Sequence, residues 1–247
     1  MYLSNARLNF KIETMQKIFS LVSLLFFINT NAQTSTYNSL LKKHVDTNVN
    51  YKGFKADEAQ LQTYLDYLAN TKPQKSWSVT KTKAFWANAY NAYTIQLILD
   101  NYPLKSIMNI KKKGKDAWSI PFAKVGGKTY TLNQIEHEIL REKYNDPKIH
   151  VAVNCASKSC PKLANYAFTG ENYEAKTTAL MKNFINDTSR NKISENRLQL
   201  SKIFEWFQGD FTKKGDLIDF LNQYSDVKIN KKATIGYLEY NWSLNGR

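Results

Sequence analysis

Apolar residues recur every three to four positions in several stretches of this chain, which is the spacing of one face of an α-helix. Polar residues occupy the opposite faces, so each of these helices is expected to pack on a core with one side only. A capping box, Thr131 with Gln134, is expected to start one of them. The stretches with this pattern are 35–45, 57–70, 132–144, 171–188 and 216–224.

A different pattern marks residues 79–102, where nearly every position is apolar or aromatic. Ser78 is the expected N-cap, and Pro103 ends the helix because proline cannot continue it. A helix that is apolar nearly all round is predicted to lie at the centre of the fold. Asn88 and Asn91 lie three positions apart on it. Buried amides must be hydrogen-bonded, so they are expected either to hold adjacent loop backbone or to line a cavity.

Short runs with turn signals predict strands. Residues 122–132 and 192–204 are typical of hairpins, residues 149–153 form a β-branched run typical of a buried strand, and residues 233–245 contain a final strand. Helices and strands are mixed without regular βαβ alternation. The fold class predicted is therefore α+β, mostly helical with a small antiparallel sheet.

The N-terminus has the pattern of a secretory signal peptide. Met15 is the expected start, followed by an apolar run over residues 18–28 and a small-residue cleavage site at Ala32. The apolar run is too short for an ordinary membrane span, and no transmembrane segment is expected in the mature chain. We predict that residues 1–32 are a signal peptide with an upstream extension. Residues 33–247 would then form a single exported domain, periplasmic or secreted.

Composition narrows the function classes. The net charge is +14 and 43% of the residues are hydrophobic, which is enough for one core. The lysines are scattered, so they favour a solvated surface, with an anionic envelope surface as the alternative partner. The chain shows no nucleic-acid-binding signature and no glycine-rich phosphate loop, so we expect neither nucleic acid nor a cofactor.

The two cysteines of the chain, Cys155 and Cys160, lie in the segment 146–161 (DPKIHVAVNCASKSCP) with His150, one of three histidines. Loops held by a rigid element are where sites are usually built. In an extended strand, His150 and Cys155 would point to opposite faces. They could meet only if the chain turns or bulges after Val153.

Thiol-dependent acyl transfer or hydrolysis is one hypothesis. Cys155 would be the nucleophile, and an imidazole from His150 or His137 would raise its thiolate fraction. Asn88 or Glu136 would orient that base. The expected site is a pocket between the helix 79–102 and the Cys155 loop, with these further pocket or structural residues: Asn91, Arg141 and Cys160.

Three alternatives stay open, and so does the question whether the protein is an enzyme at all. A Cys155–Cys160 disulfide would contribute about 2 kcal/mol and would suit a non-enzymatic cell-envelope binding or structural module. Two cysteines and two histidines could bind zinc, but the Cys-x4-Cys spacing is looser than usual, so we expect no metal. Cys155 could also be a small buried packing residue.

Aromatic residues near the C-terminus favour packing over chemistry. Trp206, Asp210 and Phe211 are typical of a capped aromatic unit. Tyr240 and Trp242 are expected to form a plug on the core.

Five blocks of the sequence together resemble the domain of unknown function 547 family, over about residues 60–245. That family has no settled activity, so the resemblance implies no substrate. The blocks are AFWANAYNAYTI (84–95), LNQIEHEILR (132–141), DPKIHVAVNCASKSCP (146–161), LSKIFEWFQGDF (200–211) and YLEYNWSLN (237–245).

A more distant resemblance is to papain- and transglutaminase-like folds, which implies a diverged papain-like arrangement. KAFWANAY is similar to the helix that begins at their cysteine, and KIHVAV is similar to the strand that carries their histidine. Phe85 stands where those folds have the cysteine. Thiol chemistry here would therefore have to use Cys155 or Cys160.

Overall fold

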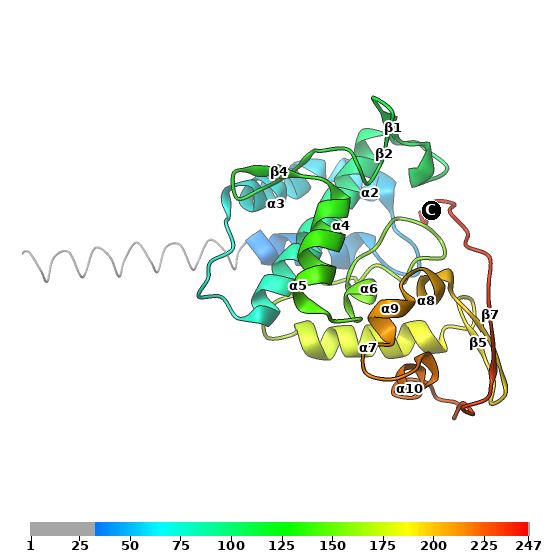
Figure 1. Cartoon of the computed structure of the whole chain (residues 1–247). Coiled ribbons are helices and arrows are strands. Elements are labelled where there is room, and N and C mark those ends of the chain that lie inside the picture. The colour runs from blue at the N-terminus through cyan, green and yellow to red at the C-terminus, as the bar shows by residue number, and fades with distance from the viewer. Residues whose placement is uncertain (1–32, 247) are drawn as a thin grey trace, which may run out of the picture.

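The computed structural model describes residues 33–246. The predicted signal peptide lies outside the described residues. The described part is mostly helical with three small sheets, which confirms the α+β class (Figure 1). Within it, none of the helices combines the length and the hydrophobicity needed to cross a bilayer.

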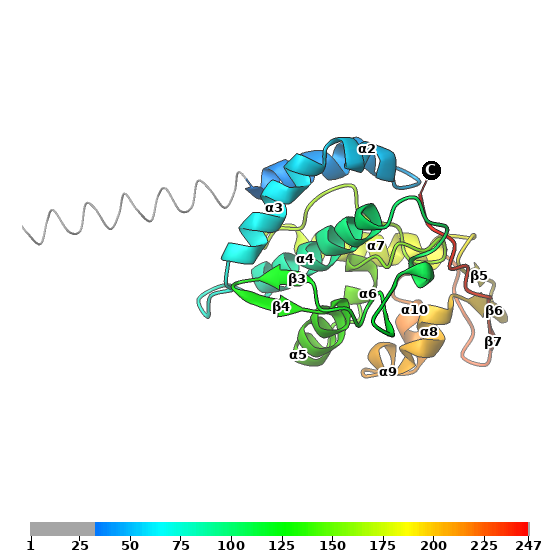
Figure 2. The same ribbon diagram turned by 90° about the horizontal axis from the view of Figure 1, so that it is seen from above.

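Helix α4 (Val79–Asp100) runs through the middle of the molecule, as its apolar sequence predicts (Figures 1 and 2). The hydroxyl of Ser78 caps it by accepting a hydrogen bond from the Lys81 N–H at 3.1 Å. A helix over residues 33–44 precedes the others. The helices that pack against α4 are α2 (Tyr51–Ala56), α3 (Glu58–Asn70), η2 (Gln134–Arg141) and α7 (Tyr173–Asn186).

The helix that follows the first hairpin has an unusual geometry. Residues Gln134–Arg141 (η2) form a π-helix, continued by α5 (Glu142–Tyr144). The predicted capping box starts it. The Gln134 N–H donates to Thr131 Oγ1 at 3.0 Å, and the Thr131 N–H donates to Gln134 Oε1 at 3.1 Å. π-Helical turns are rare and are often found at functional sites, and this one borders the cavity described below.

The expected central strand is wrong, because its residues form a helical turn, α6 (Ile149–Ala152). The Asp146 carboxylate accepts a hydrogen bond from the Lys148 N–H at 3.0 Å, and Pro147 lies between them. An Asp followed by Pro favours the start of a helix, since Asp caps the free N–H groups and Pro has the required φ. This local signal outweighs the β-branched pattern of the residues that follow.

The sheets are small and lie at the edges of the molecule. The third sheet is mixed rather than purely antiparallel, because its first two strands pair antiparallel and its last strand pairs parallel with the second. The first two sheets are the hairpins β1 (Lys111–Lys112) with β2 (Lys115–Asp116), and β3 (Ala123–Val125) with β4 (Lys128–Tyr130). The third contains β5 (Lys192–Ile193), β6 (Arg197–Leu200) and β7 (Thr234–Tyr237).

The second predicted hairpin is shorter than expected, because a helix begins at Lys202 in place of strand. The remaining short helices are η1 (Ile107–Asn109), α8 (Lys202–Trp206), α9 (Gln208–Phe211) and α10 (Leu217–Leu221).

Two hydrophobic clusters make up the core, one around α4 and one around α7 to α10. Helix α6 lies where they meet, since Ile149 and Ala152 belong to the first cluster and Val151 to the second. The loop after α6 is held by the C-terminal tail. There the Lys158 N–H donates to the Ser243 carbonyl at 2.8 Å. The fold thus places the cysteine loop between both cores and the end of the chain.

Candidate functional site

A cavity of about 180 Å³ opens beside the cysteine loop. Its wall comes from α4, the loop after β2, the π-helix η2, α6 with the loop after it, helix α8 and the C-terminal tail, so six segments meet here. The residues that line it are Tyr90, Trp118, Asn133, Glu136, His137, His150, Val153, Cys155, Cys160, Ile203, Trp206, Phe207, Tyr240 and Trp242.

Asn91 of α4 fixes the cysteine loop in place. Its amide donates to the Ala152 carbonyl at 2.8 Å, and its Oδ1 accepts from the Asn154 N–H at 2.9 Å. These bonds satisfy the backbone where α6 ends, in a buried region where an unpaired group would cost about 1–3 kcal/mol. The prediction that a buried amide of this helix holds loop backbone is confirmed for Asn91.

The residue after Cys155 has a strained backbone. Ala156 is fully buried and has φ = 60°, in the left-handed region that non-glycine residues rarely adopt. Its N–H donates to Asn154 Oδ1 at 2.9 Å, and its carbonyl accepts from the Asn245 N–H at 3.0 Å. Such a conformation costs roughly 1–3 kcal/mol and is concentrated at functional sites. Here it adjoins Cys155, which lines the cavity.

The Cys155 thiol is half-buried among hydrogen-bonding groups. Its Sγ lies 3.2 Å from Ser157 Oγ and 3.3 Å from the Tyr240 hydroxyl, and the Ser157 hydroxyl donates to Tyr240 at 2.8 Å. Hydrogen bonding with Cys160, followed by that with Ser157 and Tyr240, lowers the pKa of Cys155 to about 7, although burial acts in the opposite direction. Cys155 is therefore partly ionised near neutral pH, and a thiolate is the nucleophilic form.

Cys160 lies deeper and stays protonated. Both cysteines are free, and the Cys155 N–H donates to Cys160 Sγ at 3.1 Å. Burial raises the pKa of Cys160 well above its usual value, and the neighbouring Cys155 adds to this effect. Of the two thiols, Cys155 is thus the reactive one.

His150 is held by a carboxylate from α9. Its Nε2 lies 2.8 Å from Asp210 Oδ2, which also accepts from Arg141 Nε at 2.7 Å. Burial tends to raise the pKa of Asp210, but the hydrogen bonds from His150 and Arg141 outweigh it and bring the pKa well below its usual range. An ionised carboxylate only accepts, so His150 Nε2 carries the proton and Nδ1 is the atom that can exchange one. The His150 ring also stacks on the Phe207 ring, with the ring centres 4.4 Å apart.

His137 has a different protonation pattern. Its Nδ1 lies 3.0 Å from Arg141 Nη1. A guanidinium can only donate, so Nδ1 accepts and the neutral ring carries its proton on Nε2. His137 is thus set up to donate a hydrogen bond rather than to act as a base.

Four of the predicted site residues line the cavity together, and the others do not. The four are Cys155, Cys160, His137 and His150. Asn88 lies elsewhere, with its amide bonded to the Phe168 backbone at 2.8 and 3.0 Å, and so it cannot orient a base for Cys155. Asn91 bonds to the backbone of the cysteine loop, and Arg141 bonds to His137 and Asp210, so both support the site without lining the cavity. Within residues 33–246, neither imidazole forms a hydrogen bond with Cys155.

Sequence reasoning assigned three further site residues to packing. Asp210 holds His150, the Tyr240 hydroxyl touches Cys155, and Trp242 lines the cavity. Tyr240 also packs against the second core cluster, and its ring contacts those of Trp206 and Trp242, so the packing expected of these aromatic residues is present together with contacts at the cavity. The signal that could have found them is their place in two of the blocks that carry the family resemblance, 200–211 and 237–245.

The zinc alternative does not fit this arrangement. In the part of the chain that the structure describes, no three His, Cys, Asp or Glu side chains come together in a way that could hold a metal ion.

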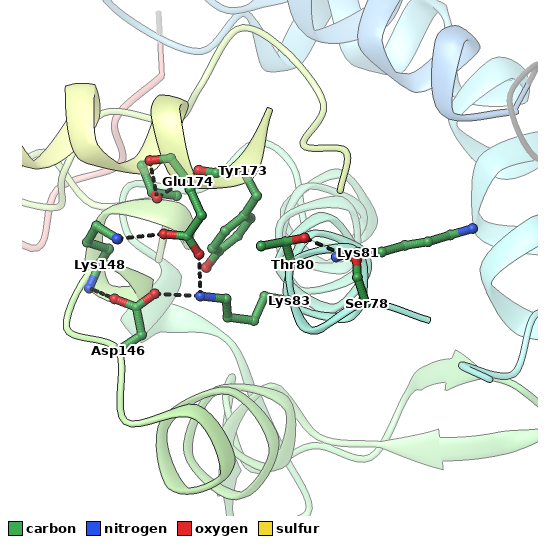
Figure 3. Close-up of polar contacts among 9 residues, drawn as sticks. Ser78, Thr80, Lys81, Lys83, Asp146, Lys148, Tyr173 and Glu174 are labelled. Carbon is green, nitrogen blue, oxygen red and sulfur yellow. Dashed lines mark hydrogen bonds and ion pairs between the residues drawn. The ribbon is translucent and has the colours of Figure 1, made fainter. Parts of the chain in front are cut away.

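A second polar cluster, drawn in Figure 3, lies at the other end of segment 146–161, and none of its residues lines the cavity. Lys83 of α4 is buried and donates to Asp146 Oδ2 and Glu174 Oε1, both at 2.7 Å. Lys148 donates to the other oxygen of Glu174 at 2.7 Å. The Lys83 ammonium also lies 4.8 Å from the ring centre of Tyr173. Every charge in this cluster has an opposite charge beside it.

The fold and site together define an α+β protein with a thiol and two imidazoles facing one cavity. Residues 74–185 match the family described as "Protein of unknown function, DUF547", which confirms the resemblance to that family over this part of the chain. The match is narrower than the resemblance over residues 60–245, and it ends before Asp210 and Tyr240. No curated protein and no solved structure matches the chain. The papain-like arrangement stays a prediction.

Proposed function

We propose that this protein is an exported enzyme that uses Cys155 for thiol-dependent acyl transfer or hydrolysis. One observation supports this most directly: a thiol with a pKa of about 7 faces the same cavity as an imidazole held by an ionised carboxylate. A nucleophile, a base and a group that orients the base are the parts that covalent catalysis requires. Asp210 takes the orienting role that the sequence had left to Asn88 or Glu136.

The reaction has two steps. The Cys155 thiolate attacks the carbonyl carbon of the substrate, the bond to the leaving group breaks, and the leaving group takes a proton from the His150 imidazolium. Water or an amine then attacks the thioester carbon and gives a proton to His150 Nδ1, which restores the thiolate and the imidazolium. The Asp210 carboxylate stabilises the imidazolium in both steps.

The direct test is acylation of the full chain by a p-nitrophenyl ester of a short-chain acid. We expect a burst of about one equivalent of p-nitrophenolate, with the acyl mass on the peptide that contains Cys155. Cys155→Ala abolishes the burst, whereas Cys160→Ala retains it. His150→Ala and Asp210→Asn slow release of the acyl group by roughly 10²–10⁴-fold, the usual contribution of general acid–base catalysis.

The hypothesis fails if the acyl group is found on another residue, or if Cys155→Ala keeps the burst.

A second candidate function, a non-enzymatic envelope module, gains its support from the Cys155 N–H bond to Cys160 Sγ, which keeps the two thiols close. The module would be favoured if the exported protein contained no free thiol and if the Cys155→Ser variant behaved like the wild-type protein. An oxidised loop of six residues would stabilise the fold by only about 2 kcal/mol.

A further inference from the structure

The cavity contains a carboxylate without a counter-ion. Glu136 of η2 lines the cavity and is half-buried, and among residues 33–246 it forms no salt bridge. Arg141, on the same helix, is bonded to Asp210. A partly desolvated carboxylate is costly unless a positive charge comes to it. The missing partner is thus expected from outside the chain.

The charge distribution of the chain makes this carboxylate unusual. The sequence has 35 lysine and arginine residues against 21 acidic ones. None of the cavity-lining residues in the described part is a lysine or an arginine. In a strongly basic protein, this cavity is a local negative site.

A buried hydroxyl in the same cavity also lacks a partner. Tyr90 of α4 is fully buried, and within the described residues its hydroxyl has no partner at ordinary hydrogen-bond distance. Burial raises the pKa of Tyr90, and the charge of Glu136 and a loose hydrogen bond with it raise the pKa further, so the hydroxyl can donate to Glu136 while its oxygen stays free to accept. The phenol and the carboxylate together present several acceptor lone pairs to the cavity. A ligand with N–H donors would satisfy them.

The remaining wall is aromatic. Trp242 packs edge-on against Trp118, with ring centres 5.7 Å apart, and lies 4.5 Å from Tyr240 and 5.9 Å from Trp206. Aromatic faces attract cations, and tryptophan does so most strongly. The aromatic wall and the carboxylate therefore favour the same kind of ligand.

We propose that the cavity binds the primary ammonium group of its ligand, with Glu136 as counter-ion, Tyr90 as acceptor and the tryptophans as aromatic wall. The volume of about 180 Å³ is below the roughly 300–1,000 Å³ of sites that enclose a drug-sized ligand, so the cavity takes the amine end of a larger molecule. This rests on the proposed function only in taking the cavity as the substrate site. The substrate class is then an amine-bearing acyl compound or an amine acyl acceptor.

The experiment compares n-butylammonium with 1-butanol, which has a similar length and no charge, by calorimetric titration of the full chain. We expect the ammonium to bind roughly tenfold more tightly, equivalent to about 1.4 kcal/mol. Glu136→Gln removes this preference. Glu138→Gln is the matched control, because Glu138 is exposed on the same helix, and it keeps the preference. Trp242→Leu weakens ammonium binding several-fold and 1-butanol binding less.

Two results would overturn the inference: equal binding of 1-butanol and n-butylammonium, or a preference that survives in a folded Glu136→Gln variant. The outcome is independent of thiol chemistry, since Cys155→Ala is expected to bind the ammonium with the wild-type preference. If that preference holds while Cys155 is never acylated, the cavity is an amine site and the proposed reaction is wrong.

Discussion

Two polar clusters flank the same segment of this chain, and they differ in how completely they are paired. Around Lys83, each ammonium and each carboxylate has an opposite charge at 2.7 Å (Figure 3). In the cavity, Glu136 forms no salt bridge with any residue of 33–246, the Tyr90 hydroxyl has no partner there at ordinary hydrogen-bond distance, and the pKa of Cys155 is lowered to about 7. A fully paired cluster has no spare bonding capacity for a ligand. The comparison therefore assigns the first to stability and the second to function.

The largest loss of stability is expected when the Lys83 ammonium is removed from the paired cluster. Lys83→Met leaves the Asp146 carboxylate in a mostly buried position without its ammonium partner. Removal of one partner of a buried pair costs about 3–5 kcal/mol, and we expect about 3 because Glu174 keeps Lys148 and is half-exposed. Urea unfolding at neutral pH measures the change in free energy. Lys52→Met, at an exposed position, should stay within about 0.5 kcal/mol. Equal stability of the two variants would contradict the assignment.

The pH dependence of Cys155 alkylation tests whether the cavity contains a prepared nucleophile. Its pKa is lowered, so the thiolate is present above pH 7 and is lost as the pH falls through about 7. At pH 6 the thiolate fraction is roughly 30-fold larger than for a cysteine with the ordinary pKa of about 8.5. Iodoacetamide alkylation, followed by mass spectrometry between pH 5 and 9, should have its midpoint near 7. Cys160→Ala removes the strongest hydrogen bond to the thiolate and should move the midpoint upward. An unshifted midpoint near 8.5 in the wild-type protein would count against a prepared nucleophile.

The smallest effect on stability is expected from a change at Glu136. Glu136→Gln removes a charge, as Lys83→Met does, but Glu136 forms no salt bridge with a described residue, so no opposite charge is left without its partner. We expect the free energy of unfolding to stay within about 0.5 kcal/mol of wild type or to rise slightly. Urea unfolding of this variant beside Lys83→Met gives the contrast directly. A loss of more than about 2 kcal/mol would show that Glu136 has a structural role.

Much of the fold was predictable because its signals are local. The apolar run of α4, its Ser78 cap and the capping box of Thr131 with Gln134 all act within a few residues, and all three form as expected. The prediction of a strand at residues 149–153 was wrong because local signals can also conflict. Two local signals competed there, and the helix start at Asp146 and Pro147 prevailed over β-branched propensity.

The helical turn also changed the geometry of the site. In a strand, His150 and Cys155 would face opposite ways, whereas after α6 and the turn at Ala156 both line the cavity. Asn88 shows the reverse case. It was a plausible orienting residue by type, but its position on α4 directs it to the Phe168 backbone instead.

The sequence by itself determined the α+β class, the buried helix α4 and the segment with Cys155, Cys160 and His150, because apolar spacing and residue type are properties of neighbouring positions. Only the tertiary structure decided that Asp210 holds His150, that Tyr240 touches Cys155 and that Glu136 lines the cavity without a salt bridge to any described residue. Those contacts join residues 60 to 85 positions apart. Packing of the whole chain brings such residues together, and no local pattern records it.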